Sequence, residues 1–198
     1  LASDFFELEY AEGVTCSRRT AQVFPDTAAG TVEGRATYQF QNTSGQGWTV
    51  CFGVDPGYDI TSARANGAEI SPVRTGYEES NMALWEIALP ADGAVELVLE
   101  YGGFPRDWNI AETTQGSPEI SGAYLCLENQ NLMPYLLNVL PEGQGYPTTV
   151  ELTAEAPADE ATRLLSPLAH VTSLRAEPLD GGRCRITLDT DCPDGDEA

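Results

Sequence analysis

The sequence contains no lysine: all ten of its basic residues are arginine, and they stand against 31 acidic residues, for a formal net charge of -21. Such an acidic surface repels phosphate backbones and anionic lipid headgroups, which argues against nucleic acids and membrane surfaces as partners. Apolar runs of the roughly 18–20 residues that a spanning helix requires are also missing, so we expect no membrane insertion by this segment.

The sequence is equally poor in metal ligands and catalytic bases. It has one histidine, His170, and none of its five cysteines forms a Cys-x-x-Cys pair. Zinc sites of the usual spacing are therefore not expected. A Gly-x-Ser-x-Gly elbow and a phosphate-binding glycine loop are absent. His170 precedes an apolar alternating run and is interpreted as an ordinary strand residue, so we expect no cofactor and no catalytic triad.

The odd number of cysteines leaves at least one thiol free. Cys51 and Cys126 lie within apolar alternating runs and are predicted to pack as small hydrophobic residues. A disulfide between Cys184 and Cys192 is an alternative that the sequence leaves open.

Alternation of apolar and polar residues with a period of two is the dominant pattern of the chain, and it predicts β-strands. Residues 31–42 place Val32, Tyr38 and Phe40 on one face. With residues 48–54, which follow a short polar turn, they predict a hairpin or two neighbouring strands of a meander.

A second hairpin is predicted from residues 83–90 and 94–101, with Trp85 and Ile87 facing Val95. Asn66-Gly67 predicts a two-residue turn, because both residues tolerate a positive φ. Other predicted strands lie at residues 5–12, 122–128, 148–155, 170–177 and 182–189.

About ten strands, with a single short helix predicted over residues 157–166, indicate an all-β fold, an antiparallel β-sandwich with little helix. No linker divides the chain, so residues 1–198 are predicted to form one domain. A long loop at residues 102–122 and an acidic C-terminal end at residues 189–198 interrupt the strand rhythm. Loops of such length in compact domains are often functional.

Several ordered stretches carry a family resemblance. They are GTVEGRATYQFQNTSGQ, then LWEIALPADGAVELVLEYGGFPRD, then LMPYLLNVLPEGQGYPTTVELTAEAP. In this order, over about residues 27–157, the chain resembles the N-terminal domain of M1-family (gluzincin) aminopeptidases and their bacterial relatives. The resemblance implies a saddle-like β-sandwich that normally docks on a zinc peptidase domain.

The resemblance also implies a non-catalytic role. The family's zinc site needs His-Glu-x-x-His, which a chain with one histidine cannot provide. We therefore expect no enzyme here, but an accessory or scaffold domain that docks on, or shapes the substrate entrance of, a missing partner domain. The expected partner is a catalytic-like or membrane-linked domain of the same full-length protein. Because bacterial relatives are often attached to membrane transporter-like proteins, we expect an extracytoplasmic location.

Glu128 and Gln130 are the candidate binding residues that the resemblance implies. Some family members use a Gln or Glu of this domain to bind the amino terminus of the substrate, and these two residues are the nearest by location. The Glu128-Asn129 pair is similar to part of the family's Gly-x-Met-Glu-Asn motif, but the Gly and the Met are missing. That motif belongs to the catalytic domain.

One alternative function is an extracytoplasmic carbohydrate- or protein-binding module that uses Trp108 in the long loop. Trp48 and Trp85 are predicted to lie in the core instead. Another alternative is a small carboxylate-dependent hydrolase. Its candidates are neighbouring acids, which chance explains in a chain with 31 of them. They are Glu78-Glu79, Glu112, Glu119 and Asp159-Glu160.

A calcium site is an alternative to a solvated acidic end at the C-terminus. Its candidate ligands are Asp189, Asp191, Asp194 and Asp196. Their spacing departs from that of an EF-type loop, Pro193 stiffens the segment, and no closing Glu follows at the right distance.

Overall fold

The computed structural model of the chain is an all-β sandwich of mostly antiparallel strands, as the sequence predicts. It describes residues 9–79, 82–90, 93–106, 119–121, 124–126, 132–143, 145–154 and 171–193. The helix predicted over residues 157–166 lies outside these ranges.

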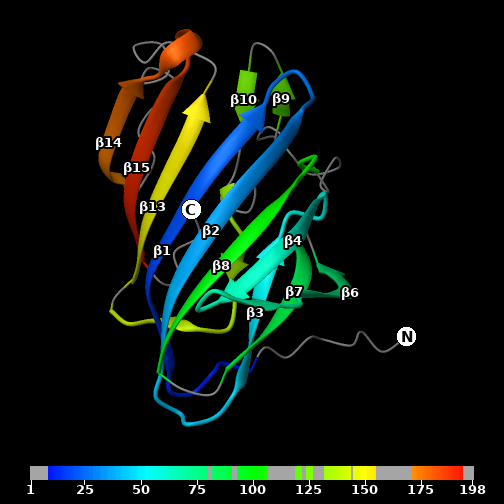
Figure 1. The fold of residues 1–198 in the computed structure, drawn as a ribbon, viewed down its shortest axis with the longest axis vertical. Coiled ribbons are helices and arrows are strands. Elements are labelled where there is room, and N and C mark those ends of the chain that lie inside the picture. The colour runs from blue at the N-terminus through cyan, green and yellow to red at the C-terminus, as the bar shows by residue number, and fades with distance from the viewer. Residues whose placement is uncertain are drawn as a thin grey trace.

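The larger sheet has nine strands and forms one layer (Figure 1). In spatial order they are β14 (Val171–Pro178), β15 (Cys184–Pro193), β13 (Gly145–Ala154), β1 (Val14–Asp26), β2 (Thr31–Asn42), β8 (Gly93–Gly103), β4 (Tyr58–Ala65) and β5 (Ala68–Ile70). β12 (Leu140–Pro141) also pairs with β1. β12 and β13 both run parallel to β1. A short 3-10 helix, η1 (Asp180–Gly182), joins β14 to β15.

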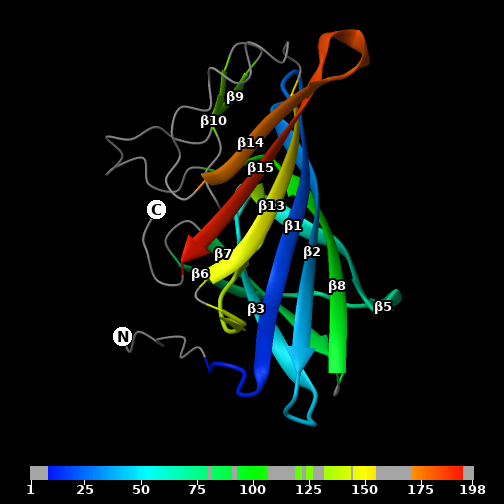
Figure 2. The same ribbon diagram turned by 90° about the vertical axis from the view of Figure 1, so that its left-hand side faces the viewer.

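The smaller sheet has four strands and lies on one side of the larger sheet (Figure 2). Its order is β11 (Tyr135–Leu136), β3 (Trp48–Val54), β7 (Met82–Leu89) and β6 (Val73–Glu79). A separate pair joins β9 (Glu119–Ser121) to β10 (Tyr124–Cys126). β9 lies inside the segment that was predicted as a long loop, and β8 extends into its start, so that prediction is corrected at both ends.

The two predicted hairpins are wrong. β2 pairs with β1 and β8, whereas β3 pairs with β7 and β11, and β7 and β8 likewise lie in different sheets. The inward-facing residues of β2 and β3 meet across the core: the rings of Tyr38 and Phe52 are 4.9 Å apart, and those of Phe40 and Trp48 are 5.2 Å apart. Each connection crosses from one layer to the other, so the alternation predicted the buried faces correctly and the strand partners incorrectly.

β1, at 13 residues, is a long strand that the sequence did not predict. Its pairing with β2 shifts register between Cys16 and Arg18. The bulge changes which residues face inward, so that Cys16 and Arg19 are both buried. Arg19 donates a hydrogen bond to Thr148 at 3.0 Å and lies 4.3 Å from the centre of the Tyr146 ring. Arg18 and Arg19, together with the bulge, interrupt the alternation of apolar and polar residues, so the sequence does not indicate this strand.

Short strands also escaped prediction: the described residues contain fifteen strands rather than about ten. Strands of two or three residues are too short to show an alternation. The strand predicted at residues 5–12 does not form over residues 9–12, and its remainder lies outside the described part. The Asn66-Gly67 turn is confirmed, with φ values of 48° and 81° between β4 and β5.

A disulfide between Cys184 and Cys192 is impossible in this fold. Both residues belong to β15, and eight residues of extended strand separate their Cα atoms by roughly 26 Å. A disulfide requires about 4.4–6.8 Å. Cys184 is a free, buried thiol, as are Cys16 and Cys51. Burial of Cys51 confirms its predicted role as a small core residue.

Candidate functional site

Most of the candidate residues that the sequence singled out lie outside the described residues. They are Trp108, Glu128, Gln130, Asp194 and Asp196. Their roles stay predictions. Trp48 and Trp85, by contrast, are placed: Trp85 is buried in the core and Trp48 packs against it, as predicted.

Asp189 lies in the middle of β15 rather than in a tail. Its carboxylate accepts a hydrogen bond from the Thr149 hydroxyl at 2.7 Å and lies 3.7 Å from the Arg175 guanidinium. Asp191 is also part of β15. Within the described ranges, no group of three or more His, Cys, Asp or Glu residues is arranged to hold a metal ion. Asp189 therefore contacts residues of the two neighbouring strands, which is a structural role.

The segment 132–141, which we call the strap, follows the candidates Glu128 and Gln130 in the sequence and joins the two sheets. It contributes β11 to the smaller sheet and β12 to the larger one. Met133, Leu136 and Val139 are buried in the core. The strap thus closes one side of the sandwich.

Three tyrosines of the larger sheet reach through the core and bind the backbone of the strap. Tyr101 donates to the carbonyl of Leu132, Tyr38 donates to that of Pro134, and Tyr146 donates to that of Val139. We call Tyr38, Tyr101 and Tyr146 the tyrosine clamp. The strap has almost no regular structure of its own, so these hydroxyls satisfy carbonyls that would otherwise be buried without partners.

Asn138 fixes the same strap to the smaller sheet. Its side-chain oxygen accepts a hydrogen bond from the backbone N–H of Cys51, and its amide donates to the carbonyl of Thr49, both at 2.9 Å. The amide also donates to the carbonyl of Glu9 at 3.4 Å. With a side chain that is 4% exposed, Asn138 takes the place of a backbone strand along this part of β3.

Burial raises the pKa of Tyr38, Tyr58 and Tyr101 above its ordinary value of 10.0. For Tyr38, the neighbouring Tyr101 adds to this effect. For Tyr58, the charge of Asp55 adds to it. The hydroxyls of Tyr38 and Tyr101 therefore remain protonated and act as donors to the strap, not as acids or bases.

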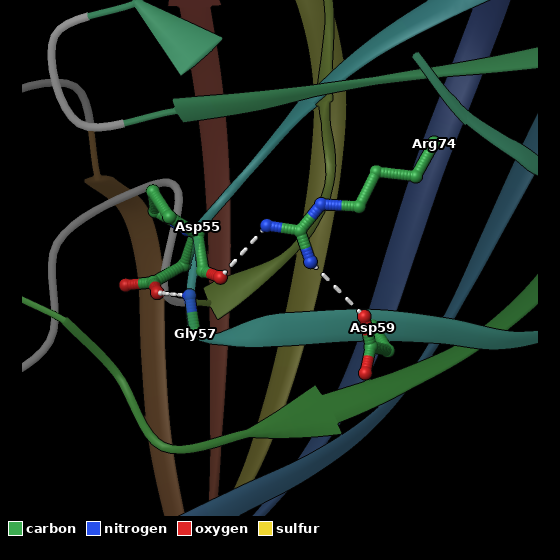
Figure 3. A network of polar contacts seen from close by, with 5 residues as sticks. Asp55, Gly57, Asp59 and Arg74 are labelled. Carbon is green, nitrogen blue, oxygen red and sulfur yellow. Dashed lines mark hydrogen bonds and ion pairs between the residues drawn. The ribbon is translucent and has the colours of Figure 1, made fainter. Parts of the chain in front are cut away.

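Asp55 is a buried carboxylate at the crossing from β3 to β4 (Figure 3). It accepts hydrogen bonds from the backbone N–H of Gly57 at 2.7 Å and from that of Arg106 at 3.1 Å. Arg74 binds the other side of this turn, donating to the Pro56 carbonyl at 3.0 Å and pairing with Asp59 at 3.2 Å. The network holds the turn between the sheets and the chain leaving β8, which is a structural role.

The outer face of the larger sheet is mostly polar, with Phe24 as an exposed apolar exception. Its exposed side chains include Arg18, Gln22, Glu33, Arg35, Gln41, Glu96 and Glu100. Several are paired across strands: Gln39 donates to Glu96 at 2.8 Å, and Gln22 donates to Glu151 at 3.1 Å. This is the composition of a sheet face in contact with water.

The outer face of the smaller sheet is mostly apolar. We call it the apolar face and define it by the side chains opposite the core on its strands. They include Thr49, Cys51, Gly53, Val73, Met82, Leu84, Glu86, Ala88 and Tyr135. Val73 is 54% exposed and Tyr135 is 42% exposed. It also carries the charged Glu86, and its central members Cys51, Gly53 and Leu84 are buried within this chain alone.

The sequences of β3 and β7 carry a signal for this face. β3 reads WTVCFGV and β7 reads MALWEIAL, so apolar residues occupy nearly every position of both strands. A strand with one wet face alternates, whereas a strand covered on both faces is apolar throughout. The apolar face is the most distinctive candidate for a functional surface in the described part of the chain.

Comparison with known proteins gives no match to a protein-family model and none to a curated protein. Solved structures do match. An M1 zinc metallopeptidase mutant from Deinococcus radiodurans, bound to a Tyr-Ser-Ala substrate, is 17% identical with a TM-score of 0.56. The match covers 91% of this chain and 40% of that chain. Yeast leukotriene A4 hydrolase is 13% identical with a TM-score of 0.57, and the match covers 92% of this chain and 27% of that chain.

A two-domain M1 zinc metallopeptidase bound to L-tryptophan is 16% identical with a TM-score of 0.57, and the match covers 93% of this chain and 41% of that chain. In the described part of the chain, no helix is long and apolar enough to cross a membrane. The chain spans about 40% of the length of the M1 metallopeptidases it matches. At these identities the likeness concerns the fold, and the chain has the fold of part of an M1 zinc metallopeptidase.

Proposed function

We propose that this chain is a non-catalytic accessory domain of a larger M1 aminopeptidase-like protein. Its role would be to dock on, or shape the substrate entrance of, a companion domain of the same protein. The single observation that carries the proposal is the exposed part of the apolar face, which includes Val73 and Tyr135, because a sheet face that stays in water is expected to be polar, as most of that of the larger sheet is. The fold likeness supports a companion, since it leaves more than half of each matched chain unaccounted for.

The family resemblance also suggests what the companion domain is and where the protein lies. Following the family resemblance, the companion is a catalytic-like or membrane-linked domain, and the assembly lies outside the cytoplasm. The single histidine of this chain leaves zinc ligation of the His-Glu-x-x-His type to other parts of the protein.

The apolar face is large enough for a substantial part of an interface. β3 and β6 have 7 residues each, β7 has 8 and β11 has 2, and at about 3.3 Å per residue and about 4.8 Å between strands they give a footprint of roughly 400 Å². A standard interface buries about 800 Å² per partner. Because its central residues are already buried within this chain, the face would supply less than half of the contact, and flanking segments would supply the remainder.

A matched pair of substitutions tests the docking role in the full-length protein. Thr49→Arg places a charge on the apolar face, and Gln41→Arg places the same charge on the polar face of the larger sheet; both positions are exposed. Neither is expected to change the stability of the isolated 198-residue chain by more than about 0.5 kcal/mol.

In the full-length protein, Thr49→Arg is expected to increase amide hydrogen exchange across β3 and β7, whereas Gln41→Arg is not. Equal exchange in the full-length protein and the isolated chain would show that nothing docks on this face. Hydrolysis of aminoacyl-coumarin substrates by the isolated chain, with or without added zinc, would refute the non-catalytic role.

A further inference from the structure

We propose that Arg19 binds a carboxylate, which its guanidinium holds through the two Nη atoms. The site lies on the inner side of the larger sheet, away from the apolar face, and it does not depend on the proposed accessory role. Free small carboxylates and the Asp or Glu side chains of the rest of a full-length protein share this chemistry, and the experiment separates the two sources.

Arg19 is the only buried arginine among the described residues, and it is 6% exposed. The arginines that pair with acids are more exposed, and these pairs are Arg64–Glu69, Arg74–Asp59 and Arg175–Asp189. Arg19 forms no ion pair with any described residue, although the chain has 31 acidic residues. A charge taken out of water without a counter-charge is costly, so this arrangement favours an anion beside the guanidinium.

The bulge in β1 is what turns Arg19 toward the inside. If the strand kept alternating from the buried Cys16, Arg18 would face the core, but the register shifts between these two residues. Arg18 is instead exposed and donates to the Thr149 hydroxyl at 3.2 Å on the outer face. Bulges often re-aim a side chain next to a functional site. The fold therefore buries one arginine of an adjacent pair and leaves the other in water.

The guanidinium of Arg19 is fixed on two of its sides. Its Nε donates to the Thr148 hydroxyl at 3.0 Å, and its central carbon lies 4.3 Å from the centre of the Tyr146 ring. The two Nη atoms donate to no described residue. Within the described part, the sealed side-chain atoms without a partner are the indole nitrogens of Trp48 and Trp85. The Nη atoms are not among them, so they keep a small contact with solvent.

The open edge of the guanidinium matches a carboxylate. Its two Nη atoms present parallel N–H groups that fit the two oxygens of one carboxylate. The titratable neighbours supply no negative charge near pH 7, because burial raises the pKa of Cys16 and of Tyr38. A formal net charge of -21 disfavours multiply charged phosphates more than a monoanion. The small exposure of Arg19 restricts the ligand to a small anion or a carboxylate on a flexible side chain.

The experiment titrates the 198-residue chain with sodium formate and, at equal ionic strength, with sodium chloride, and follows the Tm. Chloride measures the general screening of the negative charge. At ten times its Kd, formate is expected to raise the folding equilibrium constant about 10-fold beyond chloride, which is a rise in Tm of about 3–6 °C. Arg18→Met is the matched control and is expected to keep this rise. Arg19→Met is expected to lose it, and Arg19→Lys to lose most of it, because lysine lacks the fork.

A second measurement needs no variant: the Nε–H resonance of Arg19 in ¹H–¹⁵N spectra is expected to shift saturably with formate and not with chloride. Equal effects of formate and chloride, a formate effect that survives in Arg19→Met, or a larger effect of phosphate would each overturn the assignment. In the full-length protein, a formate effect equal to that in the chain alone identifies a free carboxylate as the ligand. Loss of the formate effect there, with destabilisation by Arg19→Met, identifies a side chain of the same protein.

Discussion

Replacing Asn138 by alanine is expected to destabilise the fold by about 3 kcal/mol, although the position is outside any regular strand. The substitution removes the side-chain bonds to the backbone of Cys51 and Thr49 and the longer one to Glu9. The size of the effect depends on which of these backbone groups can find water when the amide is gone.

The three bonds differ in this respect. The N–H of Cys51 is buried, and leaving such a donor unpaired costs about 2 kcal/mol. The carbonyl of Thr49 is part-buried, so we assign it about 1 kcal/mol. The bond to Glu9 is 3.4 Å long and belongs to an exposed residue, so water replaces it at little cost. The sum of about 3 kcal/mol corresponds to a fall in Tm of about 6–12 °C for a domain of this size.

Urea unfolding followed by tryptophan fluorescence measures this change, because Trp48 and Trp85 belong to the core. The midpoint is expected to fall at an unchanged m-value. Gln41→Ala, at an exposed position of β2, is the control and is expected to change the stability by less than about 0.5 kcal/mol. A loss below about 1 kcal/mol for Asn138→Ala would refute the assignment of Asn138 as a buried hub.

Asn138→Asp adds a test with a defined sign. The new carboxylate would face the Thr49 carbonyl without a proton to donate, so the fold favours its neutral form and raises its pKa above the unfolded value of about 3.9. Stability is then fully present below about pH 4 and is lost as the pH rises through the folded pKa. The variant is therefore expected to be closer to wild type at pH 4 than at pH 7 in parallel urea titrations.

Two further predictions concern the core and the crossing between the sheets. Burial raises the pKa of Tyr38, Tyr58 and Tyr101 above 10.0. The free energy of unfolding is therefore expected to be constant below pH 10 and to fall above it, by up to about 1.4 kcal/mol per pH unit for each tyrosine. Urea unfolding from pH 8 to 11 measures this slope, and Tyr58→Phe should make it shallower. Gly57→Ala is expected to cost more than about 2 kcal/mol, because the new Cβ would lie 1.7 Å from the Phe104 carbonyl oxygen. Gly143→Ala, where nothing lies within 4 Å, should be nearly neutral, and equal costs for the two would refute the steric argument.

The sequence predicted which residues of the strands are buried, because alternation reports directly on the two sides of a strand. Val32, Tyr38, Phe40 and Val95 all lie in the core as the period of two requires. Which strands pair is a different question, decided by whether a connection turns back within a sheet or crosses to the other sheet. The connection from β2 to β3 crosses, yet its Gly-rich polar composition also suits a hairpin turn, so no local signal separates the two.

The strap was beyond sequence analysis for a related reason. Its place in the fold depends on partners that are far away in the chain: Tyr38 lies 96 residues before Pro134, and Cys51 lies 87 residues before Asn138. The hydrogen bonds of Asn138 and Tyr38 to distant backbone groups produce no periodic pattern in the sequence. Such contacts emerge only once the two sheets are placed in space.

The two outer faces differ because β2 and β3 differ in their alternation of buried and exposed residues. β2 alternates strictly between buried and wet residues, and its outer face carries Glu33 and Arg35. β3 does not alternate over its last five residues, which are all buried. An alternating strand needs a core on one side only, whereas an apolar strand needs cover on both. The burial of Cys51 and Gly53 shows that the middle of the outer side is covered within this chain, and the docking experiments ask whether the companion domain covers the exposed remainder.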